Sequence, residues 1–257
     1  MSQILYEVNE HIAELTIQSP PANALSSALI NDLEERLNMI EQDATIKTVV
    51  IKGDGRFFSA GADIKEFTSL QKEADYRSLA EKGQQLFDRM EHLNVPVIAA
   101  IHGAALGGGL ELAMACHIRL ATENAKLGLP ETTLGIIPGF AGTQRLPQFV
   151  GTAKAYEMIL SGKPISGKEA YQFGLINKAV TEDDIFTEAM NLAHKIAEKS
   201  KPTIASVMKL VPYTKTSQFS QGVKAEAKEF SQVFSTEDAK EGIQAFIEKR
   251  KPNFKDK

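Results

Sequence analysis

Three short segments of this chain carry residue types that could perform chemistry. In the longest, residues 98–116 (IAAIHGAALGGGLELAMAC), three consecutive glycines precede a single acid, Glu111, in otherwise apolar surroundings. An ionised carboxylate in such surroundings is unfavourable unless it is paired or protonated, so Glu111 either lies on an exposed helix face or is tuned for proton transfer. Glycines let main-chain N–H groups approach a ligand closely, and a helix N-terminus favours negative charge. This segment is therefore typical of an oxyanion-binding site beside a carboxylate.

The other two segments are less specific when each is taken alone. Glu131 follows Pro130 in residues 127–139 (LGLPETTLGIIPG), a pattern that also suits a surface-loop carboxylate. Residues 57–65 (FFSAGADIK) follow a predicted strand, and the backbone amides of Ala60, Gly61 and Ala62 are placed where they could face a ligand.

Several other kinds of site are disfavoured by the same sequence. It contains no P-loop, and three glycines in a row do not match the spaced glycines of a dinucleotide-binding turn. Ser59 lacks the glycine two residues earlier that a serine-hydrolase elbow requires. The five histidines include no pair at helical i, i+4 spacing, and Cys116 is the only cysteine, so we expect no structural zinc site. His102 is expected to be a hydrogen-bonded structural residue.

The elements that must position these segments alternate between strands and helices. Short runs rich in β-branched or apolar residues predict strands at 12–17, 48–51, 95–101 and 118–121. Apolar residues at helical spacing predict a helix over 25–40, with Ser26 and Ser27 as capping candidates, and another over 79–93. The pattern on its own predicts repeated βα units with a largely parallel sheet.

After Thr143 helical spacing dominates. The apolar faces over 185–196 and 204–211 are typical of core packing, with a subunit interface as the alternative for some of them, and residues 219–251 predict further helix. The lysine-rich end, 249–257, suits a solvated tail or a contact with phosphates. We predict a core over residues 1–195 and a helical subdomain over 196–257 without a linker.

Composition narrows the range of partners and compartments. The 257 residues include 29 basic and 33 acidic side chains, a net charge of −4, which argues against nucleic acid or a membrane surface as the main partner. A single cysteine and an N-terminus without a leader pattern favour a cytoplasmic protein. Residues 92–110 are nineteen without a formal charge, near the roughly 20 that span a bilayer, but Pro96 and four glycines make this a poor spanning helix.

At the three segments the sequence closely resembles the crotonase superfamily and, within it, the enoyl-CoA hydratases. The resemblance runs from about Leu5 to Lys255. It rests on SAGADIKEF (59–67), PVIAAIHGAALGGGLELAMAC (96–116), LGLPETTLGIIPGFAGTQRLP (127–147) and AFIEKRKPNFK (245–255). Two departures are His117, where relatives often have aspartate, and Ala141, which interrupts a common glycine pair; neither is a proposed acid, base or oxyanion position.

The resemblance implies an α/β fold, a spiral of ββα units followed by a C-terminal helical region that forms trimers, which pair into hexamers. It implies oxyanion-binding amides at Ala62 and Gly108, with Glu111 activating a water and Glu131 as the acid. Coenzyme A contacts would come from two groups of residues, namely Ala60, Ala62, Asp63, Ile64 and Lys65, and, from the C-terminal helices, Phe230 and Lys249. Coenzyme A would enter only as part of the substrate, so no separate cofactor and no metal is expected.

The activity implied is addition of water across the 2,3 double bond of a 2-enoyl-CoA to give a 3-hydroxyacyl-CoA, as in fatty acid β-oxidation. Isomerases of the superfamily commonly keep only the acid matching Glu131, so the presence of Glu111 favours hydration. A hydratase specialised for branched or carboxylated enoyl-CoA, of the methylglutaconyl-CoA type, remains an alternative. So does a non-catalytic interaction or RNA-binding protein with this fold, although the intact acids and the acidic balance argue against it.

Overall fold

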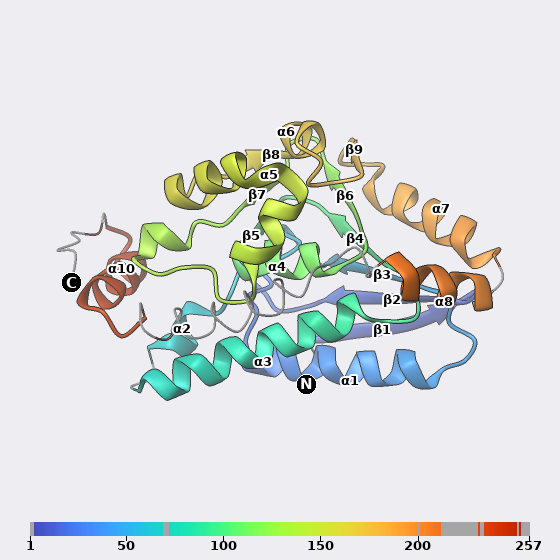
Figure 1. Ribbon diagram of the computed structural model, residues 1–257, viewed down its shortest axis with the longest axis horizontal. Coiled ribbons are helices and arrows are strands. Elements are labelled where there is room, and N and C mark those ends of the chain that lie inside the picture. Colours follow the sequence, from blue (N-terminus) through green and yellow to red (C-terminus); the bar gives the residue numbers. More distant parts are fainter. Residues whose placement is uncertain are drawn as a thin grey trace.

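The computed structural model describes residues 3–68, 72–199, 201–211, 231, 234–250 and 252. Its main sheet has six strands in the order β1-β2-β3-β4-β6-β9 (Figure 1). Their bounds are β1 Ile4–Asn9, β2 Ile12–Ile17, β3 Thr48–Gly53, β4 Val97–Ile101, β6 Ile118–Thr122 and β9 Lys178–Val180. The first two strands form an antiparallel hairpin, and from β2 onward all neighbours are parallel.

A second, smaller sheet has the order β5-β7-β8, formed by Ala104–Leu106, Lys126–Gly128 and Ile165–Ser166. Strands β5 and β7 are parallel, whereas β7 and β8 are antiparallel. Each of these strands follows a strand of the main sheet or a helix after a very short connection, so the chain turns from one sheet to the other repeatedly. This is the spiral that the resemblance implies.

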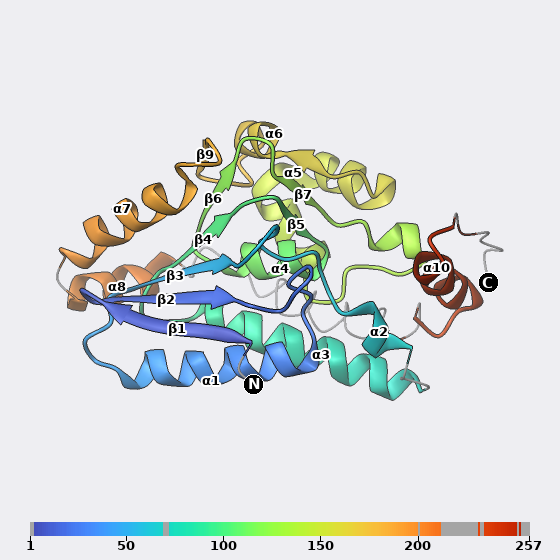
Figure 2. The same cartoon turned by 180° about the vertical axis from the view of Figure 1, so that it is seen from behind.

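Helices enclose the sheets. They are α1 Ser27–Gln42, α2 Ile64–Phe67, α3 Glu73–Glu91, α4 Gly108–Ala115, the 3-10 helix η1 Glu131–Leu134, α5 Gly142–Ser161, α6 Gly167–Gln172, α7 Ile185–Ala197, α8 Lys201–Leu210 and α10 Glu237–Ile247. Helices α1 and α3 lie side by side in both views, and α7 covers the other face of the main sheet (Figures 1 and 2).

The alternation of side chains explains why the central strands carry almost no charge. In β3, Val49 and Ile51 belong to the large core beside α1, α3 and α4, whereas Val50 packs with α7. In β4, Ala99 and Ile98 divide between the same two cores. A strand covered on both faces has a continuous apolar sequence.

The uncharged stretch 92–110 contains two packed strands and the glycine turn that follows them. It contains the buried strand β4 and the short strand β5, which is joined to it by residues 102 and 103. In the part of the chain that the structure describes, no helix is long and apolar enough to cross a membrane.

The predicted strands all form, with ends that shift by at most two residues, and the predicted helices at 25–40 and 79–93 correspond to α1 and α3. Ser26 caps α1, because its Oγ accepts a hydrogen bond from the Leu29 N–H at 3.2 Å. Of the predicted helix over 219–251, the described part contains α10, while residues 219–230 lie outside the described residues.

The expectation of a simple, largely parallel βα sheet was wrong in two respects. It missed β1, whose exposed polar residues and single fully buried side chain, Ile4, suit the edge of a sheet. It also missed the second sheet, because strands of two or three residues are too short to produce a periodic pattern. The division into residues 1–195 and 196–257 stays a prediction.

Candidate active site

A glycine turn brings the FFSAGADIK segment against the start of α4. Ser59 lies in parallel register with Ala105, since its N–H donates to Ala104 O and its carbonyl accepts from the Leu106 N–H, both at 3.1 Å. A Cβ on Gly61, which has φ +109°, would lie 2.9 Å from Leu106 O, and a Cβ on Gly109 would collide with Ser59 O. The glycines of both segments are therefore required by this close approach of two backbones.

Gly107 is the N-cap of α4 and turns the chain from β5 into the helix. Its φ is +51°, and its N–H donates to Gly128 O at 2.9 Å. A Cβ here would lie 3.0 Å from Oε1 of Glu131. The turn thus touches one of the two predicted catalytic carboxylates.

The Ala62 N–H is oriented by its own peptide. The Gly61 carbonyl accepts from the Leu25 N–H at 2.8 Å, and the Asp63 N–H donates to Leu25 O at 3.2 Å. The carbonyl and the N–H of a trans peptide point in opposite directions, so the Ala62 N–H points away from Leu25. It has no acceptor among the described residues.

Gly108, the first residue of α4, provides a second donor. Its N–H has no partner within the helix, as is usual for the first turn, and it has no other acceptor in the described part of the chain. The residue is buried beneath Leu25 and Phe140, whose side-chain atoms would lie 3.2 Å from an added Cβ. Ala62 and Gly108 therefore offer two N–H groups beside one glycine turn, at the positive end of a helix.

Glu111 is buried, with 1% of its surface exposed, so it does not lie on an exposed helix face. Its N–H donates to Gly107 O at 3.0 Å, which places it in the first turn of α4. Its Oε1 accepts two main-chain hydrogen bonds, from the Phe140 N–H at 2.8 Å and from the Gly142 N–H at 2.7 Å. Two N–H donors on one oxygen favour the ionised carboxylate.

Glu131 is set differently. It is the first residue of η1, is partly buried, and its Oε2 is shielded from solvent. Leu129 and Ile136, on either side of it along the chain, are buried. The two acids thus flank the same turn, Glu111 held by two main-chain donors and Glu131 with one carboxylate oxygen beside Gly107 and the other shielded from solvent.

The predicted coenzyme A contacts are placed only in part. Ala60, Asp63, Ile64 and Lys65 flank Ala62 and lead into α2, where Oδ1 of Asp63 accepts from the Lys65 N–H at 3.0 Å. Lys249 is exposed just after α10, a helix that packs against η1 and so lies on the Glu131 side of the molecule. Phe230 lies outside the described residues.

The remaining candidates have structural roles. The buried Ser59 Oγ donates to Asn23 O at 2.7 Å, and His102 Nε2 lies 3.0 Å from Gly55 O. Burial raises the pKa of the Cys116 thiol to about 12. Over the described ranges, no group of three His, Cys, Asp or Glu side chains is arranged to hold a metal ion.

Sequence reasoning missed the residues that hold the loop around Glu111. Gln84 of α3 and Arg145 of α5 are both buried, and each donates to a carbonyl of residues 139–140. Their only signal in the sequence is a polar side chain within an otherwise apolar helix face. Such residues are rarely fully buried unless they are paired, so the signal was too general to select them.

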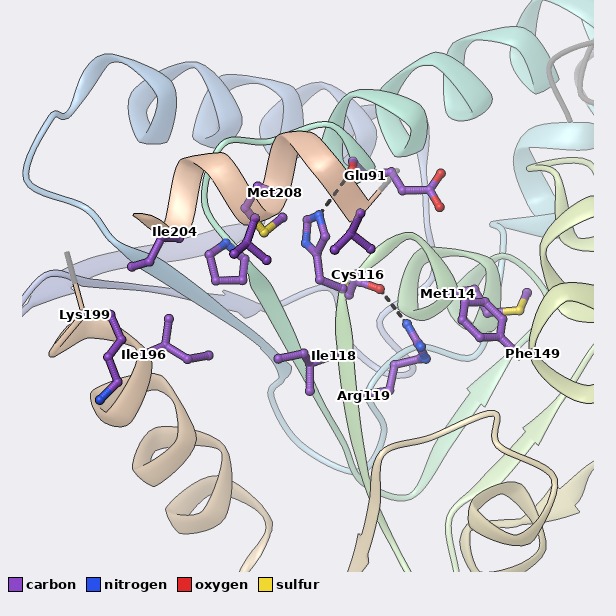
Figure 3. A pocket seen from close by; sticks show the side chains of 14 residues that line it. Glu91, Met114, Cys116, Ile118, Arg119, Phe149, Ile196, Lys199, Ile204 and Met208 are labelled. Atoms are coloured by element: carbon purple, nitrogen blue, oxygen red, sulfur yellow. Dashed lines mark hydrogen bonds between the residues drawn. The ribbon is translucent and has the colours of Figure 1, made fainter. Parts of the chain in front are cut away.

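A separate cavity of about 500 Å³ lies between α7, α8 and the C-terminal end of α4 (Figure 3). Its walls are mostly apolar, and Arg119 enters it with its guanidinium 4.2 Å from the centre of the Phe149 ring. Burial lowers the pKa of Arg119 to about 10. Neither Glu111 nor Glu131 lines this cavity, so it is distinct from the candidate site.

Comparison with known proteins agrees with this geometry. The family model described as enoyl-CoA hydratase/isomerase matches residues 7–257. The chain belongs to the enoyl-CoA hydratase/isomerase family.

Individual relatives cover essentially the whole chain. A probable enoyl-CoA hydratase of Bacillus subtilis is 59% identical over 99% of both chains, and a 2,3-dehydroadipyl-CoA hydratase of Escherichia coli is 39% identical over 99% of both. Among solved structures, an enoyl-CoA hydratase from Mycobacterium avium subsp. paratuberculosis has a TM-score of 0.89 at 25% identity, covering 99% of each chain. The predicted family, the crotonase-like α/β fold and an enzyme of the enoyl-CoA hydratase type are confirmed.

Proposed function

We propose that this enzyme adds water across the 2,3 double bond of a 2-enoyl-CoA and forms a 3-hydroxyacyl-CoA. The observation that carries this proposal is the glycine turn, which gathers two N–H donors, Ala62 and Gly108, and two carboxylates, Glu111 and Glu131, in one place. Hydration of a conjugated thioester needs both kinds of group: N–H donors that stabilise an enolate and carboxylates that transfer protons.

The two amides bind the thioester oxygen. As the water oxygen bonds to C3, the π electrons of the double bond move toward the thioester carbonyl, and negative charge collects on its oxygen. Donors that are already oriented stabilise this enolate without reorganisation, and the loss of one such donor typically costs about 3 kcal/mol.

The two carboxylates divide the proton transfers. Glu111, ionised, accepts a proton from the water as the C3–O bond forms, and Glu131, protonated, delivers a proton to C2 as the enolate collapses. After one turnover Glu111 carries a proton and Glu131 has lost one. A proton passes between them or through solvent before the next cycle.

Binding of the coenzyme A part is assigned to the backbone of residues 60–65, with Phe230 and Lys249 from the C-terminal region. Coenzyme A enters as part of the substrate, and no further cofactor or metal is needed for the steps above. We also propose a homotrimer or a pair of trimers, a cytoplasmic location and a role in fatty acid β-oxidation, all on the resemblance.

The acyl group is the least constrained part of the proposal. One relative, 38% identical over 98% of this chain, is a crotonyl-CoA hydratase of Syntrophomonas wolfei, whereas the E. coli relative is named for a carboxylated substrate. A branched or carboxylated 2-enoyl-CoA thus remains the alternative substrate. Isomerisation is disfavoured because the chain holds both acids.

The proposal is tested by mixing the purified protein with crotonyl-CoA, longer 2-enoyl-CoAs and a carboxylated 2-enoyl-CoA in water labelled with ¹⁸O. We expect the absorbance of the conjugated thioester to fall and one labelled oxygen to appear in the 3-hydroxyacyl product. A 3-enoyl-CoA is tested in parallel, and its turnover to a conjugated product without incorporation of label would instead indicate an isomerase. No turnover of any enoyl-CoA would favour a non-catalytic protein.

A further inference from the structure

The loop of residues 139–142 holds Glu111, and the loop is itself held by buried side chains. Gln84 Nε2 donates to Gly139 O at 2.9 Å, and Arg145 Nη1 donates to Phe140 O at 2.8 Å. Gln84 and Arg145 are 4% and 1% exposed, so these hydrogen bonds form away from water.

Each peptide of the loop accepts a hydrogen bond at its carbonyl, two from these side chains and one from the main chain. The Gly139 carbonyl and the Phe140 N–H belong to one peptide and point in opposite directions, so the hydrogen bond from Gln84 to the carbonyl aims the N–H at Glu111. The next peptide is fixed by Arg145 through Phe140 O. The third, whose N–H is that of Gly142, is fixed at Ala141 O by the main-chain N–H groups of Gln144 and Arg145, at 3.1 and 2.9 Å.

The loop needs this support because its backbone is strained. Ala141 has φ +70°, a left-handed conformation that residues with a Cβ rarely adopt. Such a conformation persists only where its surroundings over-determine it. Relaxation of Ala141 would turn the Gly142 N–H away from Glu111.

Arg145 is anchored at its other end. Its Nε and Nη2 donate to Oε2 of Glu91 at 3.3 and 3.1 Å, and the Arg145 side chain is 1% exposed. The main-chain oxygen of Glu91 lies 3.2 Å from Nε2 of His117 (Figure 3). Since the Val97 N–H donates to Nδ1 of His117, Nε2 carries the ring proton and donates to Glu91.

We propose that Gln84 and Arg145 are positioning residues for the Glu111 base. Gln84 orients the peptide whose N–H is the Phe140 donor, and the Arg145 side chain holds the next peptide, which joins the Phe140 donor to the Gly142 donor. Together they set the aim of the carboxylate and its ionised state. The proposal rests on the proposed function for the role of Glu111, but the positioning itself is measurable without turnover. Of the charged side chains on α3 and α5, the helices that pack against α4, Glu91 and Arg145 form a buried ion pair, and Glu131 lies on η1, which packs against α5.

The test compares Gln84→Met and Arg145→Met with Arg119→Met. Arg119 is a matched control, because it is also buried and donates to two carbonyls, Leu175 O and Cys116 O, but at the other end of α4.

In hydration of crotonyl-CoA we expect kcat to fall about 10- to 100-fold in Gln84→Met and Arg145→Met, with KM changed less than about threefold. This is the effect of misplacing a catalytic group by about 1 Å. The acidic limb of the pH–rate profile should move to higher pH, because a less well held carboxylate is protonated more easily. Arg119→Met should lower the melting temperature while keeping kcat and the pH profile.

A second readout does not depend on catalysis. In protein with ¹³C-labelled glutamate side chains, the signal that disappears in Glu111→Gln is followed through a pH titration. Its midpoint should rise in Gln84→Met and Arg145→Met and stay in place in Arg119→Met. An unchanged midpoint in both loop variants, or an equal rise in Arg119→Met, would overturn the positioning role. If Arg145→Met fails to fold, Gln84→Met decides the question alone. If the wild type turns over no enoyl-CoA but the midpoint still rises in the loop variants, the proposed hydratase activity is refuted and the positioning role is supported.

Discussion

At the scale of single residues, the chemistry depends on how differently two glutamates are held. Glu111 receives two main-chain N–H groups, whereas Glu131 has one carboxylate oxygen beside Gly107 and the other shielded from solvent. The sequence pointed to both acids through their surroundings and through resemblance. It offered no way to find the donors to Glu111, because Phe140 and Gly142 lie 29 and 31 residues away and meet it only in the folded chain.

Cys116 allows a simple test at this scale. Its thiol is buried, and burial raises its pKa to about 12, so at pH 8 only about one molecule in ten thousand carries a thiolate. We expect the native protein to leave a chromogenic disulfide reagent unreacted over the time in which guanidinium-unfolded protein releases one equivalent. Release of one equivalent by the native protein at the rate of the unfolded chain would show that the thiol is accessible.

At the scale of elements, the glycine turn can be tested by a matched pair of substitutions. Gly107 and Gly55 both have positive φ, +51° and +70°, but only Gly107 is crowded. A Cβ added to Gly107 would lie 3.0 Å from Glu131 Oε1, whereas one added to Gly55 meets nothing within 4 Å. We expect Gly107→Ala to lower kcat about 100-fold through displacement of Glu131. Gly55→Ala also adds a Cβ at a positive φ but brings it near no other group, and should keep kcat. Equal activities in the two variants would contradict the role of the turn.

A second element-scale prediction concerns the attachment of the edge strand. Oδ2 of Asp32, in α1, accepts from the Gln3 and Ile4 N–H groups at 2.6 and 2.8 Å, and its Oδ1 accepts from Arg36. Hydrogen bonds to a buried charged group are worth about 1.5–3 kcal/mol each. We expect Asp32→Ala to lower the free energy of unfolding by about 3 kcal/mol in a urea titration, and substitution of the exposed Glu35 by alanine to change it by less than about 0.5 kcal/mol. A similarly small change in the free energy of unfolding of both variants would show that β1 is held only by its hydrogen bonds to β2.

The elements also show where sequence reasoning succeeds and fails. The strand 12–17 and helix α1 were predicted closely, because each has a clear period and α1 has a capping serine. Strands β5 and β7 escaped prediction because three residues contain no period. The three glycines were recognised as unusual, but the close approach of Ser59 that requires Gly109 depends on the tertiary fold.

At the scale of the whole molecule, the assembly is the main prediction. The exposed apolar residues Val207 and Val211, at 52% and 61% exposure in and just after α8, fall in the region 196–257 assigned to trimer formation. Light scattering should therefore give three or six times the 28.1 kDa chain mass.

Substitutions can locate that interface. Val207→Asp should lower the mass of the assembly, whereas Leu160→Asp, on the outer face of α5 and at least as exposed, should leave it unchanged. A monomer in the wild type would contradict the C-terminal assignment. Loss of assembly in Leu160→Asp alone would move the interface to α5.

Two carboxylates share one hydration in the proposed mechanism, and the most direct measurement of this is turnover of crotonyl-CoA by the wild type, Glu111→Gln and Glu131→Gln. Removal of a general acid or base typically costs about 10²- to 10⁴-fold, so we predict that kcat falls by at least about 100-fold in each variant while the melting temperature changes little. Wild-type kcat in either variant would contradict the two-carboxylate mechanism.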